Sequence, residues 1–279
     1  LVVIDEQQRF GVHQRYLLAS KGKKTNVLIM TATPIPRTLT LAAFGDINVS
    51  CLREKPSGRK DIITKVAPIA RFNKIVSAIK NRVKNNERIY WVCPLIEESE
   101  VLNLVNVKKR FENLKNIFGS KVGLVHGRLK SEEKELTMKK FINGEINIIV
   151  STTVIEVGVD IPEATVMVIE HAERFGLSQL HQLRGRVGRS SAQSLCILAY
   201  DPPLTITAKT RLKVLRDTND GFRIAEEDLR LRGSGEILGI KQSGFPEFYF
   251  ADLTVHQDLI ENANNDAQKI LKTDPDLES

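Results

Sequence analysis

The alternation of strand-like and helix-like segments between residues 61 and 200 constrains the fold more than any other feature of this sequence. Short runs of β-branched and apolar residues, typical of buried parallel strands, occupy residues 62–66, 88–94, 121–125, 146–150, 165–170 and 195–200. Apolar residues at helical spacing separate several of these runs, at 72–84, 107–118 and 131–142. We expect Ser131 to cap the last of these helices and Gly144 to end it. Strands that alternate with helices predict a mostly parallel α/β sheet with right-handed crossovers.

The first sixty residues predict the end of another parallel sheet, followed by a linker. The apolar run Leu1–Ile4 ends at Asp5, a helix is expected near residues 15–20, and a second short strand at 27–30. A domain seldom begins in a central strand, so we expect the other strands of this sheet to lie in a part of the protein that precedes the sequence. Residues 53–60 (REKPSGRK) combine charge, Pro and Gly, which is the composition of an inter-domain linker.

Beyond residue 205 the pattern becomes helical. Ala208, Leu212 and Leu215 recur at helical spacing, and DTNDG at 217–221 predicts a turn before a second helix at 222–232. These two helices should fold back on each other as a hairpin. A glycine-rich loop follows around Gln242, and the polar residues after Leu271 are expected to fray.

The composition indicates a globular protein with an anionic partner. Hydrophobic residues make up 42% of the 279 and charged residues 27%, as in ordinary folded chains. The formal net charge of +7 suits nucleic acid. The three cysteines are far apart, which is typical of reduced thiols, and no apolar run is long enough to cross a membrane. We therefore expect a cytoplasmic protein that does not act in a membrane, and the five histidines show no spacing typical of a metal site.

The segment 177–190, LSQLHQLRGRVGRS, carries the side chains best suited to bind phosphate. We expect a single helix over it, with Ser178 as the N-cap. Its buried stripe would consist of Leu180, Leu183 and Val187. A second stripe of the same period would consist of Gln179, Gln182, Arg186 and Arg189. Guanidinium groups match phosphate oxygens, and the two glycines suggest close approach by another backbone or a ligand. Taken alone, the stretch is equally compatible with a solvated basic helix.

Asp5 and Glu6 form a second candidate site, at the carboxyl end of the first strand, where open α/β sheets bind ligands. Their carboxylates fit Mg²⁺ binding and orientation of an attacking water in phosphoryl transfer, although a lone Asp-Glu pair is more often an acidic turn. Thr31 and Thr33 follow the second strand. This order predicts one sheet that holds the metal and the base and a second sheet that brings arginines to them in trans.

The order of five motifs, IDEQQ, MTATPIP, VHGR, STTVIEVGVDIPEA and QLHQLRGRVGR, resembles motifs II, III and IV to VI of superfamily 2 helicases. Longer stretches, including DEQQRFGVHQR, YWVCPLIEESE and DTNDGFRIAEEDLRLRGSGEILGIKQSG, resemble the RecG family of ATP-dependent DNA helicases over essentially the whole chain. The resemblance implies RecA-like parallel sheets with flanking helices. Residues 1–57 would be the C-terminal part of the first RecA-like domain, 58–205 the second, and 206–279 a helical hairpin and loop with a tail.

The resemblance also implies a nucleotide site. Asp5 would coordinate Mg²⁺ through the nucleotide and Glu6 would be the catalytic base. Further residues at the nucleotide would be Gly158, Asp160, Gln182, Arg186 and Arg189. One of the last two arginines would act as the arginine finger, and the resemblance leaves both open.

A second set of residues would contact DNA or couple its movement to ATP hydrolysis. The resemblance assigns coupling to Thr31 and Thr33, and contact with the DNA backbone to Thr152 and Thr153. The hairpin and loop would be the family's translocation motif, with matching polar residues Arg211, Arg232 and Gln242. Without the resemblance, those last three residues would be read as part of an ordinary salt-bridged hairpin.

The implied activity of the intact protein is ATP-dependent movement on double-stranded DNA that remodels stalled replication forks and Holliday junctions. Its cofactors would be ATP and Mg²⁺, its partner branched double-stranded DNA, with single-stranded DNA-binding protein as a second candidate partner, and the motor would be monomeric. A transcription-repair coupling translocase and a non-catalytic nucleic-acid-binding module are the alternatives. The sequence contains no G-x-x-x-x-G-K-[ST] loop and no wedge domain, so we expect this chain alone to be inactive.

Overall fold

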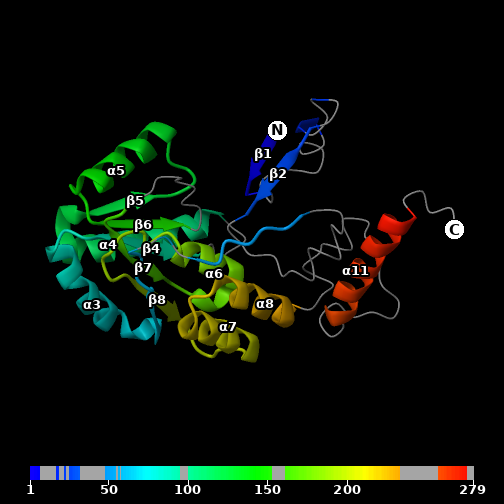
Figure 1. Cartoon of the computed structure of the whole chain (residues 1–279). Helices are drawn as coiled ribbons and strands as arrows, with labels where there is room; N and C mark the ends of the chain where they lie inside the picture. The colour runs from blue at the N-terminus through cyan, green and yellow to red at the C-terminus, as the bar shows by residue number, and fades with distance from the viewer. Residues whose placement is uncertain are drawn as a thin grey trace. The chain divides into compact units, whose positions relative to one another are not determined.

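The structure is a computed structural model that describes residues 1–6, 17–18, 22, 25–31, 48–54, 56, 58–94, 100–152, 161–232 and 257–274. The chain forms two compact units. One comprises residues 48–231, and the other combines residues 1–47 with 232–279. The larger unit contains the long alternating pattern of the sequence (Figure 1).

A six-stranded parallel sheet is the centre of the larger unit. Its strands lie in the order β3-β8-β7-β4-β6-β5, and every pairing between neighbours is parallel. The strands are β3 (Ile63–Pro68), β4 (Arg88–Cys93), β5 (Val122–Val125), β6 (Ile148–Thr152), β7 (Ala164–Ile169) and β8 (Leu195–Tyr200). All residues of β4, β6 and β7 are buried, as expected for central strands covered on both faces. The predicted parallel α/β sheet is confirmed.

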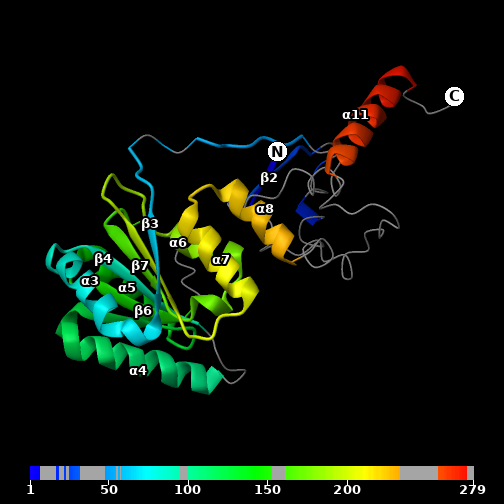
Figure 2. The same ribbon diagram turned by 90° about the horizontal axis from the view of Figure 1, so that it is seen from below.

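Helices cover both faces of this sheet (Figures 1 and 2). On one face, α3 (Phe72–Lys84) and α4 (Glu100–Phe118) pack against strand residues that include Trp91, Ile148 and Val166. On the other face, α5 (Ser131–Asn143), α6 (Leu177–Arg184) and α7 (Ile206–Asp217) pack against a set that includes Tyr90, Ile149 and Met167. Adjacent strand residues point to opposite faces, so each strand contributes to both cores.

The ends of α5 show how local sequence and distant contacts set a helix together. The expected cap, Ser131, is the first helical residue, and Lys130 occupies the N-cap position. The Lys130 backbone N–H donates to Glu133 Oε2 at 3.3 Å. Gly144 ends the helix in the left-handed region at φ 81°, as expected. The buried Arg88 side chain then donates from Nε to the Phe141 carbonyl at 2.7 Å, which satisfies one of the free carbonyls at the helix end.

The predicted helical hairpin is present in the larger unit. Helix α7 begins after Thr205, whose hydroxyl accepts from the Ala208 N–H at 3.1 Å. A short turn leads from α7 to α8 (Gly221–Arg232), and Leu215 and Ile224 from the two helices lie in the same core. Figure 2 shows α6, α7 and α8 as neighbours. The hairpin is therefore packed on the sheet domain through a shared core.

The smaller unit contains a two-stranded parallel sheet and one long helix. Strands β1 (Val2–Asp5) and β2 (Val27–Met30) pair with Asp5 opposite Met30, and β2 confirms the expected second strand. Of the helix expected near residues 15–20, only 17–18 lie among the described residues, and both are helical. Helix α11 (Gln257–Thr273) was not predicted, and it continues past Leu271, where fraying was expected. No helix in the described parts of the chain is long and apolar enough to span a membrane.

Phe141 tests the packing of α5 on the sheet. Its ring is fully buried beside Tyr90, with ring centroids 5.2 Å apart. We expect Phe141→Ala to lower the free energy of unfolding by about 3–5 kcal/mol because it leaves a cavity. The control Leu136→Ala, on the exposed face of the same helix, should change it by about 0.5 kcal/mol or less. Urea denaturation followed by the fluorescence of Trp91, the single tryptophan, measures both, and equal losses would contradict this packing.

Candidate functional site

The arginine-bearing segment is not one continuous helix, which corrects the sequence-based expectation. Helix α6 ends at Arg184, and Gly185 is its C-cap. The next two amides turn back in i→i−3 bonds, from Arg186 to the Leu183 carbonyl at 3.0 Å and from Val187 to the Arg184 carbonyl at 3.2 Å. Gly188 then adopts φ 79°, a conformation that glycine tolerates and an α-helix excludes. The arginines therefore lie on a loop after the helix.

The start of α6 also differs from the expectation. Gly176 is the N-cap, and its N–H donates to the Gln179 side chain at 3.1 Å. Ser178 lies inside the helix, where its hydroxyl donates to Asp228 of α8 at 2.5 Å. Gln179, expected on a stripe with the arginines, instead completes the helix start. Ser178 forms a link between α6 and the hairpin.

Arg186 and Gln182 are nevertheless presented to solvent, and Val187 between the arginines is buried. Arg189 is half-buried, and its Nε donates to the Gly185 carbonyl at 3.4 Å. Val187 thus anchors the loop in the core, and Arg186 beside it stays exposed. This arrangement suits the binding of an anionic oxygen group by Arg186.

Arg184, which the sequence analysis did not single out, is one of the largest fully buried side chains. Its Nη1 donates to the Leu215 carbonyl at 2.7 Å and to the Thr218 carbonyl at 2.9 Å, both at the end of α7. Its Nη2 lies 3.2 Å from His181 Nδ1. Burial, and then the Arg184 charge, lower the pKa of His181 to about 4. The position of Arg184 on the buried stripe with Leu177 and Leu180 was the sequence signal that could have identified it.

Arg211, expected to contact DNA or couple its movement to hydrolysis, is bonded to the chain that enters α6. Its Nη1 donates to the Phe175 carbonyl at 2.6 Å and its Nη2 to the Glu173 carbonyl at 3.1 Å. Together with Arg184, it fastens α7 to both ends of α6. Arg232 is the last residue of α8, and its side chain lies outside the described residues, as does Gln242.

Thr152 lies at the carboxyl end of β6 and is buried. His126 follows β5 at the same edge of the sheet. Burial, and then the charges of Lys108, Lys134 and Arg128, lower the pKa of His126. Because the arginine loop leads into the amino end of β8, Thr152 and the arginines lie toward opposite ends of the strands. Three expected site residues, Thr153, Gly158 and Asp160, lie outside the described residues.

In the smaller unit, the parallel pairing of β1 and β2 places three expected site residues, Asp5, Glu6 and Thr31, at one sheet edge. Asp5 is opposite Met30, so Glu6 and Thr31 are the next residues along the two strands. Glu6 adopts φ 52°, an uncommon conformation for a side-chain-bearing residue. Thr33 lies outside the described residues. The described residues contain no cluster of three metal ligands, but Mg²⁺ is commonly held by one or two carboxylates together with phosphate oxygens, which Asp5 fits.

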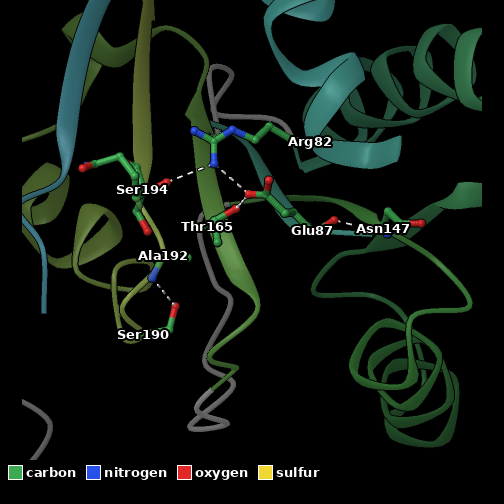
Figure 3. A network of polar contacts seen from close by, with 8 residues as sticks. Arg82, Glu87, Asn147, Thr165, Ser190, Ala192 and Ser194 are labelled. Atoms are coloured by element: carbon green, nitrogen blue, oxygen red, sulfur yellow. Dashed lines mark hydrogen bonds and ion pairs between the residues drawn. The ribbon is translucent and has the colours of Figure 1, made fainter. Parts of the chain in front are cut away.

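A polar network crosses the amino edge of the large sheet (Figure 3). Arg82 of α3 donates from Nη1 to Glu87 Oε2 at 2.9 Å and to the Gln193 carbonyl at 3.0 Å. The Thr165 hydroxyl also donates to the Glu87 carboxylate. Asn147 Nδ2 donates to the Glu87 carbonyl at 3.2 Å. The network joins the end of the arginine loop to α3, to β7 and to the residues directly before β4 and β6.

Substitution of two neighbouring arginines separates a structural role from a ligand-binding one. Arg184→Ala should lower the free energy of unfolding by about 2–4 kcal/mol, because the carbonyls at the end of α7 lose a charged donor. Arg186→Ala removes an exposed side chain and should change it by about 0.5 kcal/mol or less. Chemical denaturation monitored at Trp91 compares them. Similar losses in both variants would contradict the assignment of Arg184 to the interior.

Comparisons with known proteins agree with this architecture. Residues 70–191 match the helicase conserved C-terminal domain, and residues 218–279 match the C-terminal part of domain 3 of the ATP-dependent DNA helicase RecG. A structure of the helicase Lhr of Mycobacterium smegmatis, bound to single-stranded DNA and AMP-PNP, resembles this chain in fold alone. The match covers 77% of this chain and 31% of that one, at 14% identity and a TM-score of 0.56.

More similar proteins cover nearly all of the chain. RecG of Staphylococcus aureus is 49% identical over 98% of this chain, and RecG of Haemophilus influenzae is 50% identical over 99% of it. The matched regions make up 40% and 41% of the length of those two proteins. A structure of RecG bound to a three-way DNA junction matches 93% of this chain and 33% of that one, at 44% identity and a TM-score of 0.70. The RecA-like fold is thereby confirmed, and the chain belongs to the RecG family of ATP-dependent DNA helicases.

Proposed function

We propose that the intact protein containing this chain uses ATP to move on double-stranded DNA and so remodels branched DNA, such as stalled replication forks and Holliday junctions. The observation that carries the proposal is the likeness to RecG over 98% of the chain. The likeness to a RecG structure bound to a three-way junction supports branched DNA as the partner. The chain spans 40% of the length of the Staphylococcus aureus relative, so the activity belongs to the intact protein.

In this proposal the smaller unit supplies the carboxylates of ATP hydrolysis. Asp5, at the end of β1, would hold Mg²⁺ through the nucleotide, and the metal would supply positive charge to the phosphates. Glu6, the next residue, orients the attacking water and accepts its proton. Arg186 or Arg189 donates to the phosphate oxygens on which charge develops. Exposure of Arg186 supports this role because an arginine finger must reach a ligand outside its own domain. The remaining residues proposed beside the nucleotide are Gly158, Asp160 and Gln182.

The DNA-contacting and coupling residues are proposed from the family match. Thr31 and Thr33 couple the nucleotide to DNA, and Thr152 and Thr153 contact the DNA backbone. The net charge of +7 supports an anionic partner. The proposal includes a monomeric cytoplasmic motor, with single-stranded DNA-binding protein as a second partner.

The hairpin is proposed to couple nucleotide hydrolysis to DNA movement. Arg184, at the end of α6, donates to the end of α7, and Arg211 of α7 donates to the chain directly before α6. Ser178 bonds α6 to α8. A shift of the arginine loop is therefore transmitted to both helices of the hairpin. Arg232 and Gln242, at and beyond the end of α8, are the proposed polar residues that pass the movement on to DNA.

The arginine-finger role is tested in the intact protein. Arg186→Ala should lower the kcat of DNA-stimulated ATP hydrolysis by about a thousandfold or more, while nucleotide binding is nearly unchanged. Arg174→Ala, which removes an exposed arginine of the same domain, is the matched control and should retain turnover. Hydrolysis at the wild-type rate in Arg186→Ala would pass the role to Arg189. Absence of DNA-stimulated hydrolysis in the wild type would favour a non-catalytic binding module.

The coupling role is tested at the link between α6 and α8. Ser178→Ala removes the hydroxyl that donates to Asp228 and should leave ATP hydrolysis largely intact while slowing the remodelling of a model replication fork. The control Thr210→Ala removes an exposed hydroxyl of α7 that bonds its own helix. Fork remodelling and ATP hydrolysis are measured on the same DNA. A parallel loss of both activities would argue against coupling through this contact.

A further inference from the structure

The arginine loop is built against the chain that enters the domain from the linker. Ile62, immediately before β3, packs its side chain against Gly188. Gln193, near the end of the loop, donates from Nε2 to the Asp61 carbonyl at 2.7 Å. We call these two contacts, Ile62 with Gly188 and Gln193 with Asp61, the linker clamp. Neither is explained by the sheet pairing, which begins at Ile63 with Leu195.

The contact between Ile62 and Gly188 leaves little freedom. A Cβ atom at position 188 would lie 2.8 Å from Ile62 Cγ1 and 3.0 Å from Cδ1, closer than side chains normally approach. The same glycine needs φ 79° to turn the loop. The Ile62 side chain therefore occupies the space beside Gly188, which lies directly before Arg189 and two residues after Arg186.

The contact between Gln193 and Asp61 is held from the opposite side by the network at the amino edge of the sheet. The Gln193 carbonyl accepts from Arg82, which also pairs with Glu87 (Figure 3). The backbone of Gln193 is thus fixed by the network, while its side-chain amide bonds Asp61, the residue directly after the linker. Because the side chain bonds Asp61 and the backbone carbonyl bonds Arg82, removal of the side-chain amide leaves the network intact.

We propose that Gln193 is a positioning residue that makes the placement of Arg186 and Arg189 depend on the position of the linker, residues 53–60. The inference rests on the proposed function, in which these arginines act on a nucleotide held by another domain. Asp61 and Ile62 directly follow the linker in the chain, so a displacement of the linker reaches these two residues first. The linker clamp passes that movement directly to the arginine loop.

The test uses the intact protein and the variant Gln193→Ala. We expect the kcat of DNA-stimulated ATP hydrolysis to fall by about tenfold to a hundredfold, since a small misplacement of a catalytic group has effects of this size. The KM for ATP, the affinity for branched DNA and the thermal unfolding temperature should stay near the wild-type values. Ser191→Ala, an exposed neighbour in the same turn, is the matched control and should hydrolyse ATP normally.

A second variant addresses the other half of the clamp. Ile62→Ala removes the side chain that contacts Gly188 and should lower kcat in the same way. Hydrogen exchange should quicken at residues 185–194 in both variants.

Wild-type kcat in Gln193→Ala would overturn the inference. So would a loss of kcat accompanied by an equal loss of ATP binding or thermal stability, because that pattern indicates a merely structural role. Retained activity in Gln193→Ala together with a loss in Arg186→Ala would refute the clamp alone, whereas an inactive wild type would overturn both proposals.

Discussion

The buried guanidinium of Arg184 holds together the parts of the larger unit that bear on function. Taking a charge out of water is costly, and burial lowers the pKa of this arginine, yet a guanidinium keeps its proton. The cost is offset by carbonyls at the end of α7, which carry the negative end of the helix dipole. The Thr64 hydroxyl of β3 lies 3.4 Å from the same nitrogen. One side chain therefore joins α6, the hairpin and the edge strand.

Most of the larger sheet could be predicted because its signals are local. The strand 195–200 and the helix 72–84 have the predicted bounds, since short β-branched runs and helical apolar spacing are each read from neighbouring residues. The end of a parallel sheet expected in the first sixty residues likewise agrees with the parallel pairing of β1 with β2. The end of α6 could not be predicted in this way. Helical spacing continues through Val187, while the chain leaves the helix at Gly185.

In the candidate site, the kinds of side chain could be predicted from the sequence, but their positions could not. Residue types predicted the arginines as phosphate ligands, but their placement depends on contacts distant in sequence. Ile62 lies far from Gly188 along the chain, yet its side chain packs against this glycine of the loop. The polar stripe expected on a continuous helix would have aimed Gln179 and Arg186 at the same neighbour. In the structure Gln179 caps the helix, and Arg186 emerges from the loop beyond it.

Two arginines two residues apart consequently have opposite environments, and the end of the helix is the physical cause. Arg184 occupies the last helical turn on the buried stripe, so its side chain enters the core. The tighter turn after Gly185 rotates the chain before Arg186, which reaches solvent. A continuous helix would also have separated the two side chains in direction, but it would have carried the chain away from Ile62 and Asp61. Ending the helix at Gly185 thus lets one short segment contact the hairpin on one side and Asp61 and Ile62, directly after the linker, on the other.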